Sequence, residues 1–282
     1  MSIRSLLYVP ASSERFLAKA HERGADAIIL DLEDAVAPAQ KDAARARLGD
    51  AIAMARRGGA TIFVRINSEP ARIWLDADAA CRGGADGLLV AKVREARAIT
   101  ALAGFLDGIE QIISRKAMSL IPMIEDAGAV LDARAIATAS PRVFALVAGG
   151  EDLATALGAE PTPEVLQFPK MMVHFAAKAA GVRSFGLLRT VADYNDLEGI
   201  EKSAREARMF GFDGASCVHP AVVPILNGAF SPSPEELDRA RALIAAFETA
   251  KSEGRGAFAF EGRMVDEPVV ARARALLDRA EE

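Results

Sequence analysis

Several features that mark other protein classes are scarce or absent in this sequence of 282 residues. The two cysteines, Cys81 and Cys217, form no CxxC pair, which argues against a disulfide framework and indicates a reducing compartment such as the cytoplasm. No apolar run reaches about 18 residues and the N-terminal one is too short for a signal peptide, so we expect neither secretion nor membrane spanning. The net charge of -5 argues against nucleic acid as a partner.

Short β-branched apolar runs alternate along the chain with longer segments rich in Ala, Arg and Glu. The runs occupy residues 6–9, 27–33, 61–67, 87–93, 118–125, 143–150, 182–188 and 214–220. Eight strands separated by helices over about 220 residues are typical of a (β/α)8 barrel. An open doubly wound sheet is the alternative, but the turn PASSERF lacks the GxGxxG pattern that often opens that fold. The sequence therefore predicts an α/β protein with a (β/α)8 TIM barrel.

The chain beyond the eighth run lies outside this repeat. Pro232 and Pro234 interrupt the pattern, and Ser233 can cap a helix that ends near Gly254. A glycine-containing extended stretch and a last helix follow. We therefore expect a catalytic barrel domain over residues 1–230 and a C-terminal helical extension over residues 231–282, packed on a neighbouring subunit.

Polar side chains follow the apolar part of most runs, at the point where each strand should end. They are Asp31, Glu33, Asp34, Arg65, Asn67, Lys92, Glu125, Glu151 and Asp152. The carboxyl ends of the strands form one face of a (β/α)8 barrel, and catalytic residues lie there. Side chains alternate along a strand, so Asp31 and Glu33 share the face of Ile29, and Arg65 and Asn67 share another row. We therefore predict an apolar interior and a charged active site at one end.

Each of these residues also has a structural explanation. Asp34 and Asp152 precede helical segments that they could cap, and the carboxylates could form an ion-pair network with Arg65 that has no catalytic role. Lys92 could form a Schiff base if it were desolvated, and His219 could orient a loop or contact a substrate. The convergence of the charges on one end of the barrel favours an active site.

The carboxylates lack a histidine or cysteine partner in this set, which indicates a hard divalent cation. Mg2+ and Mn2+ prefer oxygen ligands and retain several waters. Glu125 and Asp152, from neighbouring strands, form the best pair for such an ion. Arg65 offers a planar fork that can bind a carboxylate bidentately. The expected ligand is an oxygen chelator that bears a carboxylate, such as a 2-keto acid.

A series of motifs occurs in order along nearly the whole chain: RSLLYVPASSERFLAKA, GADAIILDLEDAVAPAQKDAAR, FVRIN, IPMIEDAGAV, GGEDLATALG, GFDGASCVHPAVVPILNGAFSPSPEEL and GAFAFEGRMVDEPVVARA. Together they resemble the citrate lyase beta-subunit-like branch of the HpcH/HpaI aldolase superfamily. The resemblance implies a (β/α)8 barrel, commonly assembled as a trimer or hexamer. It also implies an enzyme that makes or breaks a carbon–carbon bond between a keto acid and the enolate of a thioester of coenzyme A (CoA) or of an acyl carrier.

The resemblance further implies roles for individual residues. Glu125 and Asp152 would hold Mg2+, and Arg65 would bind the carboxylate of the keto acid. Asp266, in the motif GRMVD, would come from a neighbouring subunit and exchange a proton with the thioester enolate. Interpreted from the residues alone, Asp266 would instead cap the last helix.

Three acids on the second run receive supporting roles. Glu33 and Asp34 would hold Arg65 and metal-bound water, whereas we expect Asp31 only to pack at the rim. Three positions depart from the family pattern. Lys170 stands where relatives often have arginine, Gly186 where they often have aspartate, and Ala91 where proline is common.

The expected function is that of a Mg2+-dependent carbon–carbon lyase. Its substrate would be a 3-hydroxyacyl thioester resembling citramalyl-, malyl- or citryl-CoA, and its products would be a 2-keto acid and an acyl-CoA. A malate-synthase-like or thioesterase-like activity on the same site is one alternative. A non-catalytic citrate lyase-like subunit is another.

Overall fold

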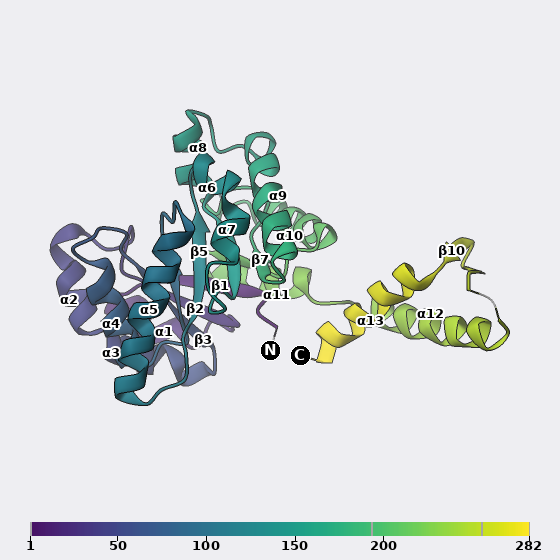
Figure 1. The fold of residues 1–282 in the computed structure, drawn as a ribbon, viewed down its shortest axis with the longest axis horizontal. Helices are drawn as coiled ribbons and strands as arrows, with labels where there is room; N and C mark the ends of the chain where they lie inside the picture. The colour runs from purple at the N-terminus through teal and green to yellow at the C-terminus, as the bar shows by residue number, and fades with distance from the viewer. Residues whose placement is uncertain (1, 193, 255, 282) are drawn as a thin grey trace. The chain divides into compact units, whose positions relative to one another are not determined.

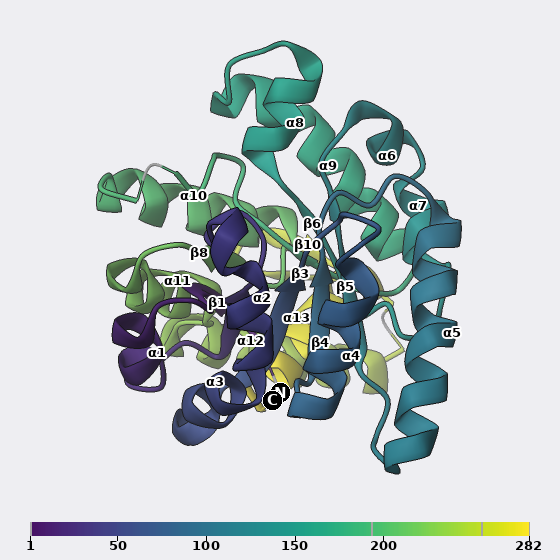
Figure 2. The same cartoon turned by 90° about the vertical axis from the view of Figure 1, so that its left-hand side faces the viewer.

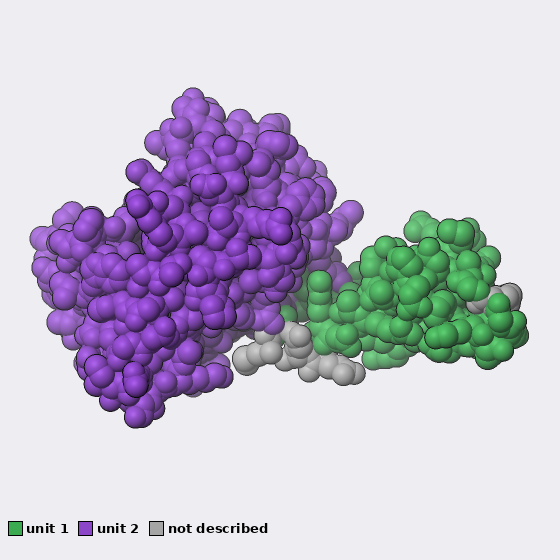
Figure 3. All heavy atoms as spheres, viewed as in Figure 1, with its two compact units in different colours: residues 1–2, 229–282 green, residues 3–228 purple. Residues whose placement is uncertain are grey.

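The computed structural model describes residues 2–192, 194–254 and 256–281, and the chain forms two compact units. Ile3–Gly228 make up one, here called the barrel unit, and Met1–Ser2 with Ala229–Glu282 make up the other, here called the C-terminal unit (Figure 3). No helix among the described residues is long and apolar enough to cross a membrane.

Parallel strands form the centre of the barrel unit (Figure 1). They are β1 (Ser5–Pro10), β2 (Ala27–Asp31), β3 (Thr61–Ile66), β4 (Gly87–Val90), β5 (Ser119–Ile124), β6 (Ala145–Ala148), β7 (Arg183–Phe185) and β8 (Ala215–Cys217). The strand order is β7-β6-β5-β4-β3-β2-β1-β8, and a parallel bridge between Phe185 and Gly214 joins the two ends. This nearly closed eight-stranded arrangement confirms the predicted (β/α)8 barrel, and each strand lies within or beside its predicted run.

Helices cover the outside of the strands, as Figure 2 shows for α1, α3 and α5. They are α1 (Glu14–Ala20), α2 (Lys41–Ala46), α3 (Leu48–Ala55), α4 (Ile73–Gly83), α5 (Ala96–Ile113), α6 (Ala127–Leu131), α7 (Ala133–Ala137), α8 (Gly150–Leu157), α9 (Pro163–Ala179), α10 (Leu197–Phe210) and α11 (Val223–Phe230). Helix α5 illustrates why these segments are helical. It buries Ile99, Leu102, Leu106 and Ile109 at spacings of three and four residues, which places them on one face.

Apolar side chains fill the barrel interior at alternate positions of each strand. Ala27 and Ile29 of β2, Phe63 of β3 and Met123 of β5 belong to this cluster. The next residues on the same faces are Asp31, Arg65 and Glu125, at the end where the strands terminate, here called the mouth. On each of these strands, the inward-facing residue two positions after the last apolar one is therefore charged, and the interior ends in a charged mouth.

The C-terminal unit has its own secondary structure and a small core. Its elements are α12 (Pro234–Ser252), the antiparallel strands β9 (Phe258–Phe260) and β10 (Arg263–Val265), and α13 (Glu267–Glu281). Ser233 begins α12 with a capping box that includes Glu236, which confirms the predicted start of this helix. Phe247, Val265 and Val270 form the core.

Candidate active site

Arg65 lies at the centre of the charges at the mouth. Its Nε and Nη2 donate to the two oxygens of Asp31, at 2.7 and 2.6 Å, and both side chains are buried. Asp31 and Arg65 are direct neighbours in the register of β2 and β3. The Tyr8 ring packs on the guanidinium, with 5.1 Å between the ring centre and Cζ. Burial favours the neutral form, but the bonds and charge of Asp31 outweigh it, so the pKa of Arg65 is raised and the side chain stays charged.

This geometry corrects the expectation that Asp31 only packs at the rim. Asp31 is the bidentate partner of Arg65, and it also accepts hydrogen bonds from the main-chain N–H groups of Glu33 and Ala35, at 2.8 and 3.2 Å. One edge of the guanidinium is therefore already occupied, and a ligand carboxylate would have to approach Arg65 from the Nη1 side.

Glu33 and Asp34 lie beside Nη1 of Arg65, which donates one hydrogen bond to Asp34 and none to Glu33. Glu33 Oε2 lies 3.0 Å from Nη1, and Asp34 Oδ2 lies 3.1 Å from it. Glu33 is buried whereas Asp34 is exposed. Burial raises the pKa of Glu33. Burial also acts to raise the pKa of Asp34, but the nearby charges of Arg65 and Lys92 outweigh it and lower that pKa.

Lys92 follows β4 and joins these acids to the next strand. Its Nζ donates to Glu33 Oε1 at 2.7 Å, and its main-chain N–H donates to Glu125 Oε2 at 2.5 Å. The bond to Glu33 is the main reason that the pKa of Lys92 is raised, so the amine stays protonated. A Schiff base needs a neutral amine, and this environment does not favour one.

Glu125 is a buried carboxyl group that forms no ion pair with a cationic side chain of the described residues. Burial is the main reason that its pKa is raised to about 7, and the negative charges of Asp152 and Glu33 add to the effect. The carboxyl lies against Gly149, where an added Cβ would come within 2.5 Å of Oε1. The absence of a side chain at Gly149 makes room for Glu125 in this position.

Asp152 lies in the first turn of α8, directly after Glu151 and three residues after Gly149. Its charge acts on Glu125 and on Lys92, which places it in the same cluster. Glu151 faces a different neighbour and accepts a hydrogen bond from the Thr190 hydroxyl in the loop after β7. The mouth thus combines Asp31, Glu33, Asp34, Arg65, Lys92, Glu125 and Asp152.

Asn67 does not join this cluster, although alternation along its run placed it there. Strand β3 ends at Ile66, and Asn67 turns toward α4, where its Nδ2 donates to Asp76 and to the main-chain oxygen of Leu32. Lys41 donates to its Oδ1. Asn67 therefore supports the main chain at Leu32, between Asp31 and Glu33.

The positions that depart from the family pattern have defined places. Lys170 is buried in α9, directly after the internal Pro169, and its Nζ donates to the carbonyls of Leu187 and Arg189, at 2.9 and 2.7 Å. Gly186 follows β7, and its N–H donates to Gly214. Ala91 packs in the barrel core.

Asp266 lies in the C-terminal unit, between β10 and α13. It is half-buried, and its carbonyl oxygen accepts hydrogen bonds from the N–H groups of Val269 and Val270 in the first turn of α13. This arrangement agrees with a place at the start of the last helix. A catalytic role for Asp266 stays a prediction.

The mouth suits magnesium better than a metal held wholly by protein side chains. No group of three His, Cys, Asp or Glu side chains gathers around one point among the described residues. Two carboxylates, Glu125 and Asp152, leave positions for waters and substrate oxygens, which Mg2+ prefers. Glu33 Oε2 is buried and accepts no hydrogen bond from the described residues, so it could accept one from a metal-bound water.

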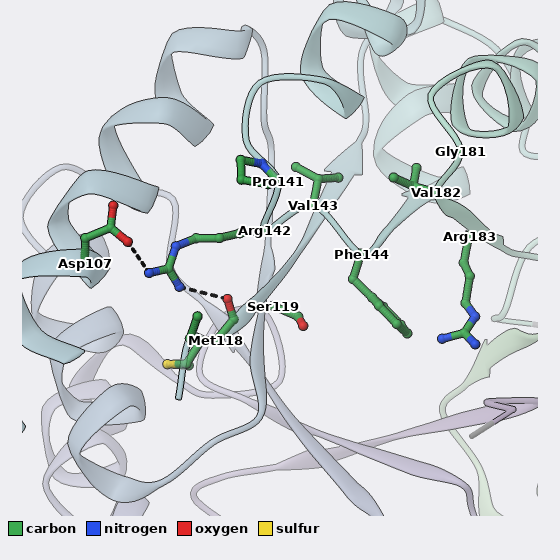
Figure 4. A pocket seen from close by; sticks show the side chains of 11 residues that line it. Asp107, Met118, Ser119, Pro141, Arg142, Val143, Phe144, Gly181, Val182 and Arg183 are labelled. Atoms are coloured by element: carbon green, nitrogen blue, oxygen red, sulfur yellow. Dashed lines mark hydrogen bonds and ion pairs between the residues drawn. The ribbon is translucent and has the colours of Figure 1, made fainter. Parts of the chain in front are cut away.

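Two cavities lie at opposite ends of the barrel. One of about 340 Å³ at the mouth is lined by Tyr8, Pro10, Asp31, Asp34, Ala35, Arg65 and Val218. A larger one of about 730 Å³ lies where β5, β6 and β7 begin (Figure 4). Its Arg142 is directed at Asp107, Glu110 and the carbonyl of Met118, so this guanidinium already has partners. The acids and cations that suit catalysis lie at the mouth.

Comparisons with known proteins identify the family of this chain. The model of the HpcH/HpaI aldolase/citrate lyase family matches residues 4–220. A (3S)-malyl-CoA thioesterase of Cereibacter sphaeroides is 37% identical to this chain, over 99% of this chain and 94% of the length of the relative. The citrate lyase subunit beta of Escherichia coli (strain K12) is 33% identical, over 99% of this chain and 93% of its own.

A solved structure extends the similarity to the whole fold. The protein CitE from Mycobacterium tuberculosis, in complex with magnesium, acetoacetate and coenzyme A, is 33% identical with a TM-score of 0.81, over 100% of this chain and 99% of that one. Magnesium and coenzyme A, the cofactors that the resemblance implies, are both present in that complex. The family model covers most of the chain, and relatives above 30% identity match it along nearly its whole length. The chain therefore belongs to the HpcH/HpaI aldolase/citrate lyase family and is an enzyme of the aldolase and citrate lyase type.

Proposed function

We propose that this protein is a Mg2+-dependent carbon–carbon lyase that cleaves a 3-hydroxyacyl thioester of CoA into a 2-keto acid and an acyl-CoA. The observation that carries the proposal is the buried Glu125, which has no cationic side-chain partner among the described residues and lies in the field of Asp152. A carboxylate in this environment is stabilised when a cation binds. The magnesium, acetoacetate and coenzyme A in the Mycobacterium tuberculosis relative support the same chemistry.

Glu125 and Asp152 would hold the metal. When bound, magnesium supplies a Lewis acid that neutralises charge on the keto-acid half of the substrate. Arg65 would bind the carboxylate of that half through its Nη1 side, and Glu33 and Asp34 would keep the guanidinium in place. The substrate would thus be held between Arg65 of β3 and Glu125 at the end of β5.

Asp266 would transfer the proton at the carbon next to the thioester carbonyl. In cleavage a base takes the proton of the 3-hydroxyl group as the carbon–carbon bond breaks, and Asp266 donates a proton to the enolate carbon of the acyl-CoA; in condensation Asp266 removes that proton. Asp266→Asn should abolish turnover of citramalyl-CoA or malyl-CoA while leaving pyruvate or glyoxylate binding unchanged, as measured by calorimetry. Wild-type turnover in the absence of any divalent metal would contradict the mechanism.

Variants of the mouth should separate metal binding from turnover. Glu125→Ala should lose Mg2+ affinity, whereas Glu33→Ala should lower turnover more than Mg2+ affinity, because Glu33 acts on Arg65 and water rather than on the ion. Calorimetry with Mg2+ and a keto acid also tests the alternative of a non-catalytic subunit. Binding that does not depend on the metal would favour that alternative.

Thioester hydrolysis is a second candidate, favoured by the 37% identity to a (3S)-malyl-CoA thioesterase. The products distinguish the two reactions. A lyase releases acyl-CoA together with a keto acid, whereas a thioesterase or a malate-synthase-like enzyme releases free CoA together with a hydroxy acid. Mass spectrometry of the products from one thioester therefore decides between them.

We also propose that the protein is a cytoplasmic homotrimer or hexamer in which the C-terminal unit packs on a neighbouring subunit and contributes Asp266. Mixing inactive Asp266→Asn with inactive Glu125→Gln tests this arrangement. If the site is shared between subunits, mixed oligomers regain part of the activity because some sites carry both intact residues. Separate, unmixed variants are the control. No recovery after confirmed subunit exchange would place Asp266 in the same chain as Glu125.

A further inference from the structure

Lys92 contacts both halves of the mouth. Its main-chain N–H donates to Glu125, one of the two proposed metal ligands. Its ammonium donates to Glu33 and lies 3.7 Å from Asp34, the acids on the Nη1 side of Arg65. One residue therefore connects the carboxyl group that would hold the metal with the acids that hold the guanidinium.

Lys92 also has a backbone conformation that is unfavourable for lysine. Its φ of 54° lies in the left-handed region, where a non-glycine backbone is strained. Ser114 and Glu261 share this conformation, but Ser114 ends helix α5 and Glu261 lies in the turn between β9 and β10, where the chain reverses. The strain at Lys92 lies at the mouth, where main chain and side chain contact different acids.

We propose that Lys92 is a positioning residue for the lyase reaction, which acts by holding Glu125 through its main chain and Glu33 through its ammonium group. With one oxygen of Glu33 bound to Lys92, the other approaches Arg65 without forming an aligned hydrogen bond. Without the ammonium, Glu33 would be free to turn both oxygens to Arg65, and the carboxylate of the keto acid would have to compete with it. The inference rests on the proposed function, because it assigns keto-acid binding to Arg65.

The charge of Lys92 distinguishes this role from simple support of the metal. Its ammonium lies in the field of Asp152, and a cation beside a metal site repels a divalent ion. Removing the ammonium should therefore leave Mg2+ affinity unchanged or increase it. A residue that merely supports the metal ligands would instead lower Mg2+ affinity when its side chain is removed.

Three substitutions separate the side chain from the main chain. Lys92→Met removes the charge at similar length, and Lys92→Gly also relieves the strain while keeping the N–H that Glu125 accepts. For both variants we expect an unchanged or lower Kd for Mg2+ alone. Pyruvate affinity at saturating Mg2+, and turnover of citramalyl-CoA, should each fall by about tenfold or more. Lys92→Arg keeps the charge and should recover most of both losses.

A double-mutant cycle tests whether Lys92 acts through Glu33. In a Glu33→Gln background, Lys92→Met should have little further effect on pyruvate affinity, because the carboxylate that it holds is gone. Lys178→Met is the matched control. Lys178 pairs with Asp213 at 2.6 Å and has a similar exposure, 37% against 39% for Lys92, but Asp213 lies where β8 begins, at the opposite end of the barrel from the mouth. This control should leave all three quantities unchanged.

The outcomes divide clearly. Three results would each overturn the proposal. They are a loss of Mg2+ affinity in both Lys92→Met and Lys92→Gly, wild-type pyruvate affinity in Lys92→Met, and an effect of Lys92→Met on pyruvate affinity that is as large in the Glu33→Gln background as in the wild type. An inactive wild-type protein on both thioesters would overturn the proposed function instead. In that case the Mg2+ and pyruvate affinities would still decide the role of Lys92.

Discussion

The bond network of Asp31 makes Asp31→Asn the most direct test of how the mouth is built. The two carboxylate oxygens of Asp31 accept from Nε and Nη2 of Arg65 and from the N–H groups of Glu33 and Ala35. An asparagine keeps one acceptor oxygen and replaces the other by an NH2 group, which would face two donors. The variant therefore loses half of the acceptors and the charge that balances a buried guanidinium.

The size of the effect follows from burial. Removing one partner of a buried ion pair destabilises a protein by about 3–5 kcal/mol, because the remaining charge has no compensation. Asp31 and Arg65 are 1% and 8% exposed. Glu33 and Asp34 still contact Arg65, so we expect the lower end of this range, about 3 kcal/mol. Equilibrium unfolding in guanidinium chloride, followed by circular dichroism, measures it as a shifted midpoint at unchanged slope.

Asp34→Asn is the matched control, since Asp34 contacts the same guanidinium at 3.1 Å but its side chain is 55% exposed. Exposed ion pairs contribute about 0–1 kcal/mol, so this variant should unfold nearly as the wild type does. If the two variants differed by less than about 1 kcal/mol, the argument from burial would be refuted. Pyruvate affinity should fall in Asp31→Asn as well, because Arg65 would lose its fixed orientation.

Burial raises the pKa of Glu125 to about 7, so Mg2+ must displace a proton from this carboxyl below that pH. The Mg2+ affinity should therefore fall roughly tenfold per pH unit below pH 7 and stay constant above it, as measured by calorimetry. Gly149→Ala would bring a Cβ within 2.5 Å of Glu125 Oε1 and should weaken Mg2+ binding at least about tenfold, whereas Gly108→Ala, which meets no atom within 4 Å, should not. Burial lowers the pKa of Lys170 to about 8 from 10.5, so the unfolded chain binds more protons between these pH values. Wild-type stability should therefore rise relative to Lys170→Met by on the order of 3 kcal/mol from pH 8 to 10.5, as measured by denaturant unfolding.

The barrel could be predicted because its signal is local. Each strand is a short apolar run, and alternation along it determines which side chains face the interior. The same rule placed Asp31 and Arg65 correctly on the faces of Ile29 and Phe63. It was wrong for Asn67, because alternation applies only while the strand continues, and β3 ends one residue earlier.

The partners at the mouth depend on features that a single run does not contain. Asp31 meets Arg65 because β2 and β3 pair in the register Ala27 with Thr61, and this register follows from how the whole barrel closes. Lys92, which has a left-handed backbone, contacts acids that follow two other strands, Glu33 after β2 and Glu125 after β5. Gly149 belongs to a pair of glycines before the acids of α8, but its role becomes clear only in the structure, where Glu125 lies against it.

The balance of charges predicts that a metal has to bind before an anionic substrate does. The mouth gathers five carboxyl groups, Asp31, Glu33, Asp34, Glu125 and Asp152, and two cations, Arg65 and Lys92. If all are ionised, three negative charges remain in excess, and they would repel a keto acid and a CoA thioester. A divalent cation offsets two of them, whereas without the ion the only relief is partial protonation of Glu125, whose pKa is raised. If Glu125 and Asp152 hold the metal as proposed, the acids at the mouth also make substrate binding depend on that metal.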